Sequence, residues 1–521
     1  MLPADLSEAR RFPAGCVATP HHLASAAGLA VLASGGNAVD AAVAANLALG
    51  VVAPYLCGFG GDLFALVWRD GLTAYNGSGR APAAATPDAV RASVGPEVDG
   101  MPQRGPHTVT VPGAVDGWFA LLERFGSRSF GALARQALDY AEGGFELTRR
   151  GAAAIERSKA VLAGFDGWRA VYGDAAPGRV LRQPALARTI RALSDEGPDA
   201  YYRGAIASAI AECVTDAGGF LGPADMAEHR GEWVDPLIAP YRDVQIAELP
   251  PNTQGVTALE ALRIVEAAGS LPPDGPDRQH LLLEAMTLAL ADRDAYVGDP
   301  DHMPVPAETL ASGEWAADRA RSIGERATEP APGRAVVGGT GYLCAADSEG
   351  TLVSLIQSNY AGFGSGLTVP RWGVNLHNRG TFFSLDPGHP STVGPRRRPL
   401  HTLIPAMALR EGRPWLAFGT MGGDGQAQTH VQVLTRVVDD GEDVQRAIDA
   451  PRWVVSPRDW SVVADERFEA GWLEALRGRG HRVGVAPWFD PVFGHAHVIE
   501  VTRGGYAAAS DPRSEGAALG R

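Results

Sequence analysis

Thr340 is the residue with the clearest potential for chemistry, because it follows two glycines and opens an apolar run of strand character. The stretch reads GGTGYLCAAD from position 338 to 347. Cleavage of the Gly339–Thr340 bond would leave Thr340 with a free α-amine, whose ordinary pKa of about 7.7–8.0 lets part of it act as a base at neutral pH. One residue would then supply both the nucleophile and its base, the arrangement used by N-terminal threonine enzymes.

The segments on either side fit a residue that must become a chain end. Residues 308 to 334 are polar, with two prolines and a glycine near their end, which predicts a mobile surface linker. An autoproteolytic bond belongs at the end of such a segment, since the new termini must separate. After Thr340 the pattern predicts a hairpin, with strands at 342–347 and 352–357 joined by Ser348-Glu349-Gly350.

The rest of the chain alternates between helical and strand patterns. Apolar spacing predicts two helices in 20–53, separated by Gly35-Gly36-Asn37, a mostly helical region over 115–215, and two more helices in 256–296. Further strands are predicted at 63–68, 244–248, 405–409, 415–418 and 497–501. Such an order fits an α+β fold in which helices pack on two sheets.

Composition excludes several classes of function. The net charge is −14, and the one basic cluster is Arg396-Arg397-Arg398, so neither a nucleic-acid nor an anionic-membrane partner is expected. Lys159 is the only lysine and has no glycine-rich loop before it, which disfavours a Walker loop. No run reaches the roughly 20 apolar residues of a membrane helix, and the N-terminus has no apolar core of signal-peptide length, so we expect a cytoplasmic protein. We expect no cofactor.

Ten short motifs give the chain a resemblance to the gamma-glutamyltransferase family. They begin with the segment 21–67, which contains GGNAVDAA, and continue through NGSGRAPAAAT (76–86), VPGAVDGW (111–118), the segments 218–255 and 289–306, FGSG (363–366), GPRRRPLHTLIPAM (394–407), GTMGGDGQ (419–426), DAPRW (449–453) and DPRSEGAALG (511–520). Each is weak alone, but their shared order is specific. The resemblance implies an N-terminal nucleophile hydrolase with a four-layer αββα sandwich.

The same resemblance implies how the chain is processed. Self-cleavage between Gly339 and Thr340 would give a large subunit, residues 1–339, and a small subunit, residues 340–521, interleaved in one domain. The two pieces would form a heterodimer, with a dimer of heterodimers as the larger alternative. The substrate would be a small-molecule amide or γ-glutamyl compound.

Four residues match the family's catalytic positions. Thr340 aligns with the nucleophile, and Gly422-Gly423 with the glycine pair whose N–H groups form the oxyanion hole. Ser358 stands where the family has a threonine that bonds the nucleophile's amine, and serine keeps the hydroxyl.

The substrate-binding positions depart from the family. Its carboxylate-binding arginine aligns with Ser78, so we assign that role to Arg80, two residues along an extended segment. Tyr360 replaces an asparagine, and His401-Thr402 replace a serine pair. Phe382 replaces the aspartate that holds the glutamyl α-amine, which leaves that ammonium without a partner.

Three functions remain open from the sequence. The first is a self-processing amidohydrolase that removes a small acidic acyl group to water, similar to the branch with cephalosporin acylases and oxamate amidohydrolases. The second is a conventional γ-glutamyl transpeptidase or glutathione hydrolase, and the third is a non-catalytic ligand-binding homologue. His495-x-His497 has no recognisable third ligand, so we expect a solvated strand face and no metal.

Overall fold

Two seven-stranded sheets form the centre of the molecule, and the computed structural model describes residues 8–95, 98, 100–330 and 339–521. The first sheet has the order β1-β20-β19-β15-β14-β9-β8. Its strands are β1 (Arg10–Phe12), β8 (Leu237–Tyr241), β9 (Val244–Glu248), β14 (Ala406–Arg410), β15 (Arg413–Thr420), β19 (Ala496–Thr502) and β20 (Gly505–Ser510).

The second sheet has the order β21-β2-β10-β11-β3-β4-β7, with β10 and β11 near its centre. Its strands are β2 (Cys16–Thr19), β3 (Asp62–Trp68), β4 (Leu72–Asn76), β7 (Glu232–Val234), β10 (Gly339–Ala346), β11 (Leu352–Tyr360) and β21 (Ala517–Gly520). The predicted hairpin is confirmed, because β10 pairs antiparallel with β11 and Tyr342 lies opposite Ile356. In both sheets, strands from before and after Thr340 are neighbours.

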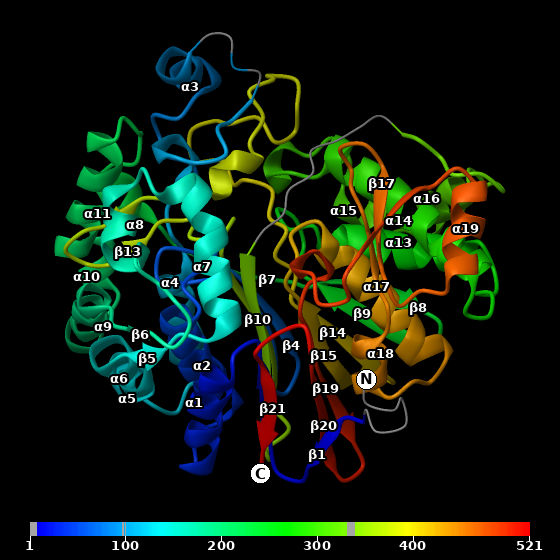
Figure 1. Ribbon diagram of the computed structural model, residues 1–521, viewed down its shortest axis with the longest axis horizontal. Helices are drawn as coiled ribbons and strands as arrows, with labels where there is room; N and C mark the ends of the chain where they lie inside the picture. Colours follow the sequence, from blue (N-terminus) through cyan, green and yellow to red (C-terminus); the bar gives the residue numbers. More distant parts are fainter. Residues whose placement is uncertain (1–7, 96–97, 99, 331–338) are drawn as a thin grey trace.

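Each sheet buries both faces. Phe64, Ile356, Met407 and Ile499 belong to one apolar cluster that fills the space between the two sheets. The outer face of the second sheet packs on α1 (His22–Ala33), α2 (Ala38–Val52) and α4 (Ala114–Phe125), and that of the first on α13 (Gly255–Ala267), α14 (Pro276–Tyr296) and α17 (Gly425–Asp439). Figure 1 shows the strands between these two groups of helices. The prediction of an α+β fold is confirmed.

The remaining elements lie around this centre. The helices are α3 (Pro87–Val94), α5 (Phe130–Leu133), α6 (Arg135–Gly143), α7 (Arg149–Leu162), α8 (Asp166–Tyr172), α9 (Pro184–Glu196), α10 (Asp199–Tyr202), α11 (Ala205–Asp216), α12 (Pro223–Glu228), α15 (Ala307–Leu310), α16 (Gly313–Ala320), α18 (Val444–Asp449) and α19 (Ala470–Gly478). Small sheets pair β5 (Phe145–Glu146) with β6 (Val180–Leu181), β12 (Thr368–Val369) with β13 (Val374–Asn375), and β16 (Trp453–Val455) with β17 (Ser461–Asp465) and β18 (Arg482–Ala486).

The turn of the β10–β11 hairpin is fixed to a buried helix. Asp347 accepts hydrogen bonds from the backbone N–H groups of Glu349 and Thr351 inside the turn, and from Ala38 N at 2.8 Å. Ala38 is the first residue of α2, where free N–H groups and the helix dipole favour a carboxylate. This contact holds the strand that begins near Thr340 against α2.

The segment before Thr340 is more ordered than its composition predicted. Residues 307–320 form α15 and α16, and Ser312 caps the second helix through its hydroxyl. Ala316 is buried against α13 and α14, so this part is not a free linker. The end of the predicted linker, from residue 331, lies outside the described residues. None of the helices described is both long and apolar enough to cross a membrane.

Candidate active site

Thr340 lies at the start of β10 with its side chain buried and its hydroxyl fixed. Its Oγ1 donates a hydrogen bond to Ser358 Oγ at 3.2 Å, and Ser358 Oγ donates to the carbonyl oxygen of Gly339 at 2.6 Å. Gly339 O belongs to the peptide bond that joins Gly339 to Thr340. The Thr340 hydroxyl and the Gly339 carbonyl therefore share one hydroxyl partner.

Ser358 is held in this role by the end of its own strand. Tyr360 N donates to Ser358 Oγ at 2.7 Å, so the serine oxygen accepts two hydrogen bonds and gives its proton to Gly339 O. Tyr360 adopts a φ of 72°, in the left-handed region that a bulky residue rarely occupies. The backbone turns there, opposite Gly339, where the β10–β11 register shifts. Such local strain is concentrated at functional sites.

The glycine pair follows β15 and precedes α17. Gly422 and Gly423 have φ values of 143° and 58°, which L side chains adopt with difficulty. Gly423 O accepts from Gln254 Nε2 at 3.0 Å, and the same nitrogen donates to Thr402 O at 3.0 Å. Gln254 thus joins the glycine pair to the predicted substrate position Thr402. Arg293 orients the amide by donating to Gln254 Oε1 at 2.8 Å.

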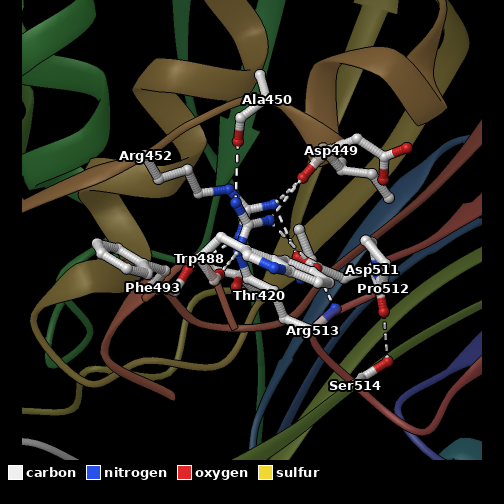
Figure 2. Close-up of polar contacts among 12 residues, drawn as sticks. Thr420, Asp449, Ala450, Arg452, Trp488, Phe493, Asp511, Pro512, Arg513 and Ser514 are labelled. Carbon is white, nitrogen blue, oxygen red and sulfur yellow. Dashed lines mark hydrogen bonds and ion pairs between the residues drawn. The ribbon is translucent and has the colours of Figure 1, made fainter. Parts of the chain in front are cut away.

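A buried arginine pair fixes the loop that ends in Gly494. Figure 2 shows the guanidinium groups of Arg452 and Arg513 converging on Asp511, which accepts from Arg452 Nη2 at 2.7 Å. Burial would raise the pKa of Asp511, but the two guanidinium groups together hold it below its ordinary range. Arg452 Nη1 also donates to Phe493 O at 2.9 Å, fixing the loop that ends in Gly494.

Gly494 is where this loop touches the glycine pair. Its φ is 72°, and a Cβ there would lie 2.2 Å from Met421 O, so only glycine allows the loop to approach Met421 this closely. Arg452 of the motif DAPRW and Asp511 and Arg513 of DPRSEGAALG form ion pairs that fix this loop. The loop in turn packs on Met421, next to the glycine pair.

Asp62 is a buried carboxylate with four polar contacts, and the sequence did not single it out. It opens β3 directly after the glycine-rich turn GFGG, the signal that could have pointed to it. Its Oδ2 lies 3.1 Å from His401 Nε2 and 3.4 Å from His377 Nδ1, while Gly79 and Gly113 donate backbone N–H groups to Oδ1. Burial opposes its charge, but His377, His401 and Arg379 hold the pKa of Asp62 below its usual range.

His401 and Thr402 occupy this region as predicted residues of the site. His401 is completely buried, and burial together with Arg379 lowers its pKa to about 3, so it is neutral at pH 7. Thr402 Oγ1 accepts a hydrogen bond from Arg379 Nη1 at 3.1 Å. His401 and Thr402 therefore connect Asp62 with Arg379.

Arg379 is the second residue that the sequence analysis missed. Only 1 % of it is exposed, its Cζ lies 4.5 Å from the Tyr360 ring centre and 5.3 Å from that of Phe382, and the two rings are 4.9 Å apart. Its Nε and Nη2 have no hydrogen-bond partner among the described residues. Burial lowers its pKa to about 10, still far above neutrality, so it carries a full charge. Arg379 lies three residues before Phe382, a predicted substrate-binding position, and this closeness in sequence could have pointed to it.

Arg80 lies outside this network. Its side chain is 38 % exposed and pairs with Glu232 at 3.1 Å, and its Nη1 donates to Arg396 O. It lines a surface cavity with Glu228 and Arg230. Ser78, by contrast, is buried and accepts a hydrogen bond from Asn252 Nδ2 at 2.9 Å. The structure therefore brings together Thr340, Ser358, Tyr360, Phe382 and the His401-Thr402 pair, but not Arg80.

His495 and His497 do not form a solvated strand face. His497 is fully buried, with its ring stacked on Tyr342 at 6.4 Å, and burial lowers the pKa of His495 and His497 to about 4 and about 3. The prediction of an exposed pair was wrong, because β19 lies inside the first sheet with its inner face against the second sheet.

Comparison with known proteins identifies the family. The family model described as gamma-glutamyltranspeptidase matches residues 24–521. The chain belongs to the gamma-glutamyltranspeptidase family. The resemblance read from the motifs is therefore confirmed, and with it the expectation of an amide-hydrolysing enzyme that matures from a proenzyme.

Several members of the gamma-glutamyltranspeptidase family align over almost the whole chain. The glutathione hydrolase-like YwrD proenzyme of Bacillus subtilis is 37% identical over 520 residues, 97% of this chain and 98% of that one. The oxamate amidohydrolase proenzyme of Klebsiella pneumoniae is 37% identical over 525 residues, with the same coverage. The crystal structure of cephalosporin acylase from Bacillus halodurans matches with a TM-score of 0.93 and 38% identity, covering 98% of this chain and 97% of that one.

Proposed function

We propose that this enzyme cuts itself between Gly339 and Thr340, and that Thr340 then hydrolyses amides whose acyl group carries a carboxylate. The products of the cut are a large piece, 1–339, and a small piece, 340–521, that remain together as a heterodimer. The alternation of their strands in both sheets supports this, since neither piece would form a complete sheet alone. The packing of helices outside two facing sheets fits the four-layer αββα arrangement.

The self-cleavage follows from the contacts of the intact bond. Thr340 Oγ1 attacks the carbonyl carbon of Gly339, and its hydroxyl proton passes to the amide nitrogen as the C–N bond breaks. This leaves an ester on Thr340 Oγ1 and releases the α-amine. Ser358 donates to Gly339 O, so it stabilises the negative charge that develops on this oxygen. Water then hydrolyses the ester, which leaves the carboxylate of Gly339 and the free N-terminus of Thr340.

The mature reaction uses the same hydroxyl on a substrate. The α-amine of Thr340, with an ordinary pKa near neutrality, accepts the proton as Oγ1 attacks the substrate amide. The backbone N–H groups of Gly422 and Gly423 then stabilise the oxyanion, each donor being worth about 2.7–4 kcal/mol. As the intermediate collapses, the α-ammonium of Thr340 gives its proton to the leaving amine, and an acyl ester on Thr340 remains. Water then hydrolyses this ester and releases the acid.

Arg379 is the observation that selects the substrate class. Nε and Nη2 of the buried Arg379 have no hydrogen-bond partner among the described residues, although the carboxylates of Asp62 and Asp424 act on its charge. A planar carboxylate of a ligand would match these two donors. Arg379 is linked to the nucleophile through Tyr360 and Ser358, and to the glycine pair through Thr402 and Gln254. We therefore assign the carboxylate-binding role to Arg379, and not to Arg80.

Phe382 argues against conventional γ-glutamyl transfer. Its ring lies against Tyr360 and below the Arg379 guanidinium, where a carboxylate would be needed to hold a glutamyl α-amine. A relative of this chain is named an oxamate amidohydrolase, and oxamate is an amide that carries a carboxylate and no amine. The γ-glutamyl activity stays as a second candidate because Arg379 would accept its α-carboxylate as well.

Three matched anilides test the proposal with processed protein. Glutaryl anilide carries the carboxylate, butyryl anilide lacks it, and γ-glutamyl anilide adds the α-amine. We expect kcat/KM for the glutaryl compound to exceed that for the butyryl compound by at least about tenfold, and to equal or exceed that for the γ-glutamyl compound. A γ-glutamyl preference of about a hundredfold, or 2.7 kcal/mol, would favour the conventional enzyme instead.

A further inference from the structure

His280, Glu284 and His481 converge on one point away from the active site. His280 and Glu284 are one turn apart on α14 and so share a face, and His481 precedes β18. His280 Nδ1 lies 2.8 Å from His481 Nε2, which is 3.9 Å from Glu284 Oε1, and the ligand atoms all lie within 4.8 Å of one another. All three residues are buried. Arg293, in the Gln254 network, is thirteen residues further along α14, or about 20 Å.

We propose that these three side chains bind a divalent transition-metal ion, for which zinc is the best match. Two imidazoles and one carboxylate are a zinc ligand set that leaves a fourth position for water. Bonds of about 2.0–2.1 Å in tetrahedral geometry place neighbouring ligand atoms about 3.3 Å apart. The distance from His280 Nδ1 to His481 Nε2 is 2.8 Å, and that from His481 Nε2 to Glu284 Oε1 is 3.9 Å, so the two lie on either side of this value.

The surroundings orient each ligand as a metal site requires. His280 Nε2 lies 2.8 Å from Gly324 O, to which it donates, so the lone pair of Nδ1 faces His481 and Glu284. Thr328 N donates to Glu284 at 3.0 Å and fixes the carboxylate. The His481 ring packs edge-on against that of His280, with the ring centres 5.1 Å apart.

The surroundings of Glu284 leave room for a cation. Glu284 is buried and has no arginine or lysine among its ion pairs in the described part of the chain. A cation at the centre of the three ligands would compensate the charge of this carboxylate. Arg479, near His481 in the sequence, forms its own ion pair with Asp277.

The site would join the two products of self-cleavage. His280 and Glu284 belong to the large piece and His481 to the small piece, if the cut falls at Gly339–Thr340 as proposed above. Gly324 and Thr328, which orient the ligands, lie on the segment that leads toward the cut. The ion would therefore fasten the end of the large subunit to the small subunit. Metal binding itself rests only on the three ligands and holds whether or not the chain is cut.

Metal analysis of the full-length protein tests the inference. The protein is stripped with a chelator, dialysed against zinc sulfate and then dialysed against metal-free buffer. Elemental mass spectrometry should then find one zinc per chain. Zinc should raise the melting temperature of the stripped protein, because an ion that binds only the folded state stabilises it. The visible spectrum of a cobalt-loaded sample should be that of a four-coordinate site.

Variants assign the ion to this cluster. His481→Gln and Glu284→Gln should each retain below about 0.1 zinc per chain and lose the zinc-dependent shift in melting temperature. His495→Gln, which removes an imidazole that is not part of the cluster, should behave as wild type. Retention of below about 0.1 zinc by wild type, or equal zinc in wild type and both variants, would overturn the proposal. If a variant fails to fold, the wild-type stoichiometry and melting shift decide it alone.

Discussion

Arg379 is the residue on which substrate selection depends. Arg379→Gln removes the charge but keeps a polar side chain, and we expect KM for glutaryl anilide to rise by about 10- to 150-fold, the equivalent of a charged hydrogen bond of 1.5–3 kcal/mol. The KM for butyryl anilide should stay within about twofold. Steady-state kinetics on both substrates measure this difference.

Arg80 supplies the matched control, since it is an arginine already paired with Glu232 at the surface. Arg80→Gln should leave both KM values near those of wild type. A larger rise in KM for the glutaryl compound in Arg80→Gln than in Arg379→Gln would return the carboxylate-binding role to Arg80. Arg379→Lys should recover part of the binding, because it restores the charge without the planar fork.

Ser358 should act on self-cleavage through its bond to Gly339 O. Ser358→Ala removes a side-chain hydroxyl that contacts both Thr340 Oγ1 and the Gly339 carbonyl, so cleavage should slow by about 10- to 1,000-fold. Ser358→Thr keeps the hydroxyl and should be cut at a rate close to wild type. The rates are read from gel bands during incubation of freshly purified precursor. Equal rates for the alanine variant and wild type would show that this hydroxyl takes no part.

At the scale of elements, Gln254 positions the glycine pair between β15 and α17. Gln254→Leu removes the donor to Gly423 O and Thr402 O, and we expect kcat to fall by about 10- to 100-fold as the oxyanion donors lose their alignment. Stability should fall as well, because buried carbonyl groups lose their partner, at about 1–3 kcal/mol each.

Gln428 distinguishes the two effects of this substitution. It is also a buried glutamine, and its Nε2 donates to Asp424 O and Val455 O without contacting either glycine. Gln428→Leu should lower the melting temperature by a similar amount and leave kcat within about threefold of wild type. Equal losses of kcat in the two variants would mean that Gln254 acts only through stability.

The elements around Thr340 could be predicted because their patterns are local. The β10–β11 hairpin, β9, α1, α2, α13 and α14 follow from apolar spacing and turn residues, and the structure confirms them. The short strands at the sheet edges, such as β1, β7 and β21, were missed because pairing with distant strands creates them. The helices α15 and α16 were missed for a related reason: burial of Ala316 against α13 and α14 overrides their polar composition.

The site was predictable only where a motif carried it. Thr340, Ser358 and the glycine pair follow from motif positions. Arg379, Asp62 and Gln254 depend on which side chains the fold buries without partners, and a sequence does not state that. The cluster of His280, Glu284 and His481 combines an i, i+4 pair with a residue about two hundred positions away, so no spacing within the sequence reveals it.

For the whole molecule, buried neutral histidines predict acid sensitivity. Burial lowers the pKa of His401 and of His497 to about 3, below the ordinary value of about 6.5 in the unfolded chain. Between these values the unfolded state binds more protons, so the free energy of unfolding should fall as pH decreases from about 6.5 toward 3. Each histidine contributes a loss of about 2 kcal/mol at pH 5.

Denaturant unfolding between pH 5 and pH 7.5 measures this dependence. His497→Gln should reduce the loss of stability at pH 5 relative to wild type, whereas His302→Gln, at an exposed position, should not. An unchanged pH dependence in His497→Gln would show that this imidazole is not kept neutral by folding.

Self-cleavage at Thr340 is the central claim, and the N-terminus of the small fragment tests it most directly. Purified protein of 54.6 kDa should convert into two pieces, and Edman sequencing of the small one should read Thr-Gly-Tyr-Leu-Cys, beginning at Thr340. Its intact mass should equal that of residues 340–521, and Thr340→Ala should remain a single chain. A small fragment that begins at any other residue, or cleavage of Thr340→Ala at the wild-type rate, would contradict the account.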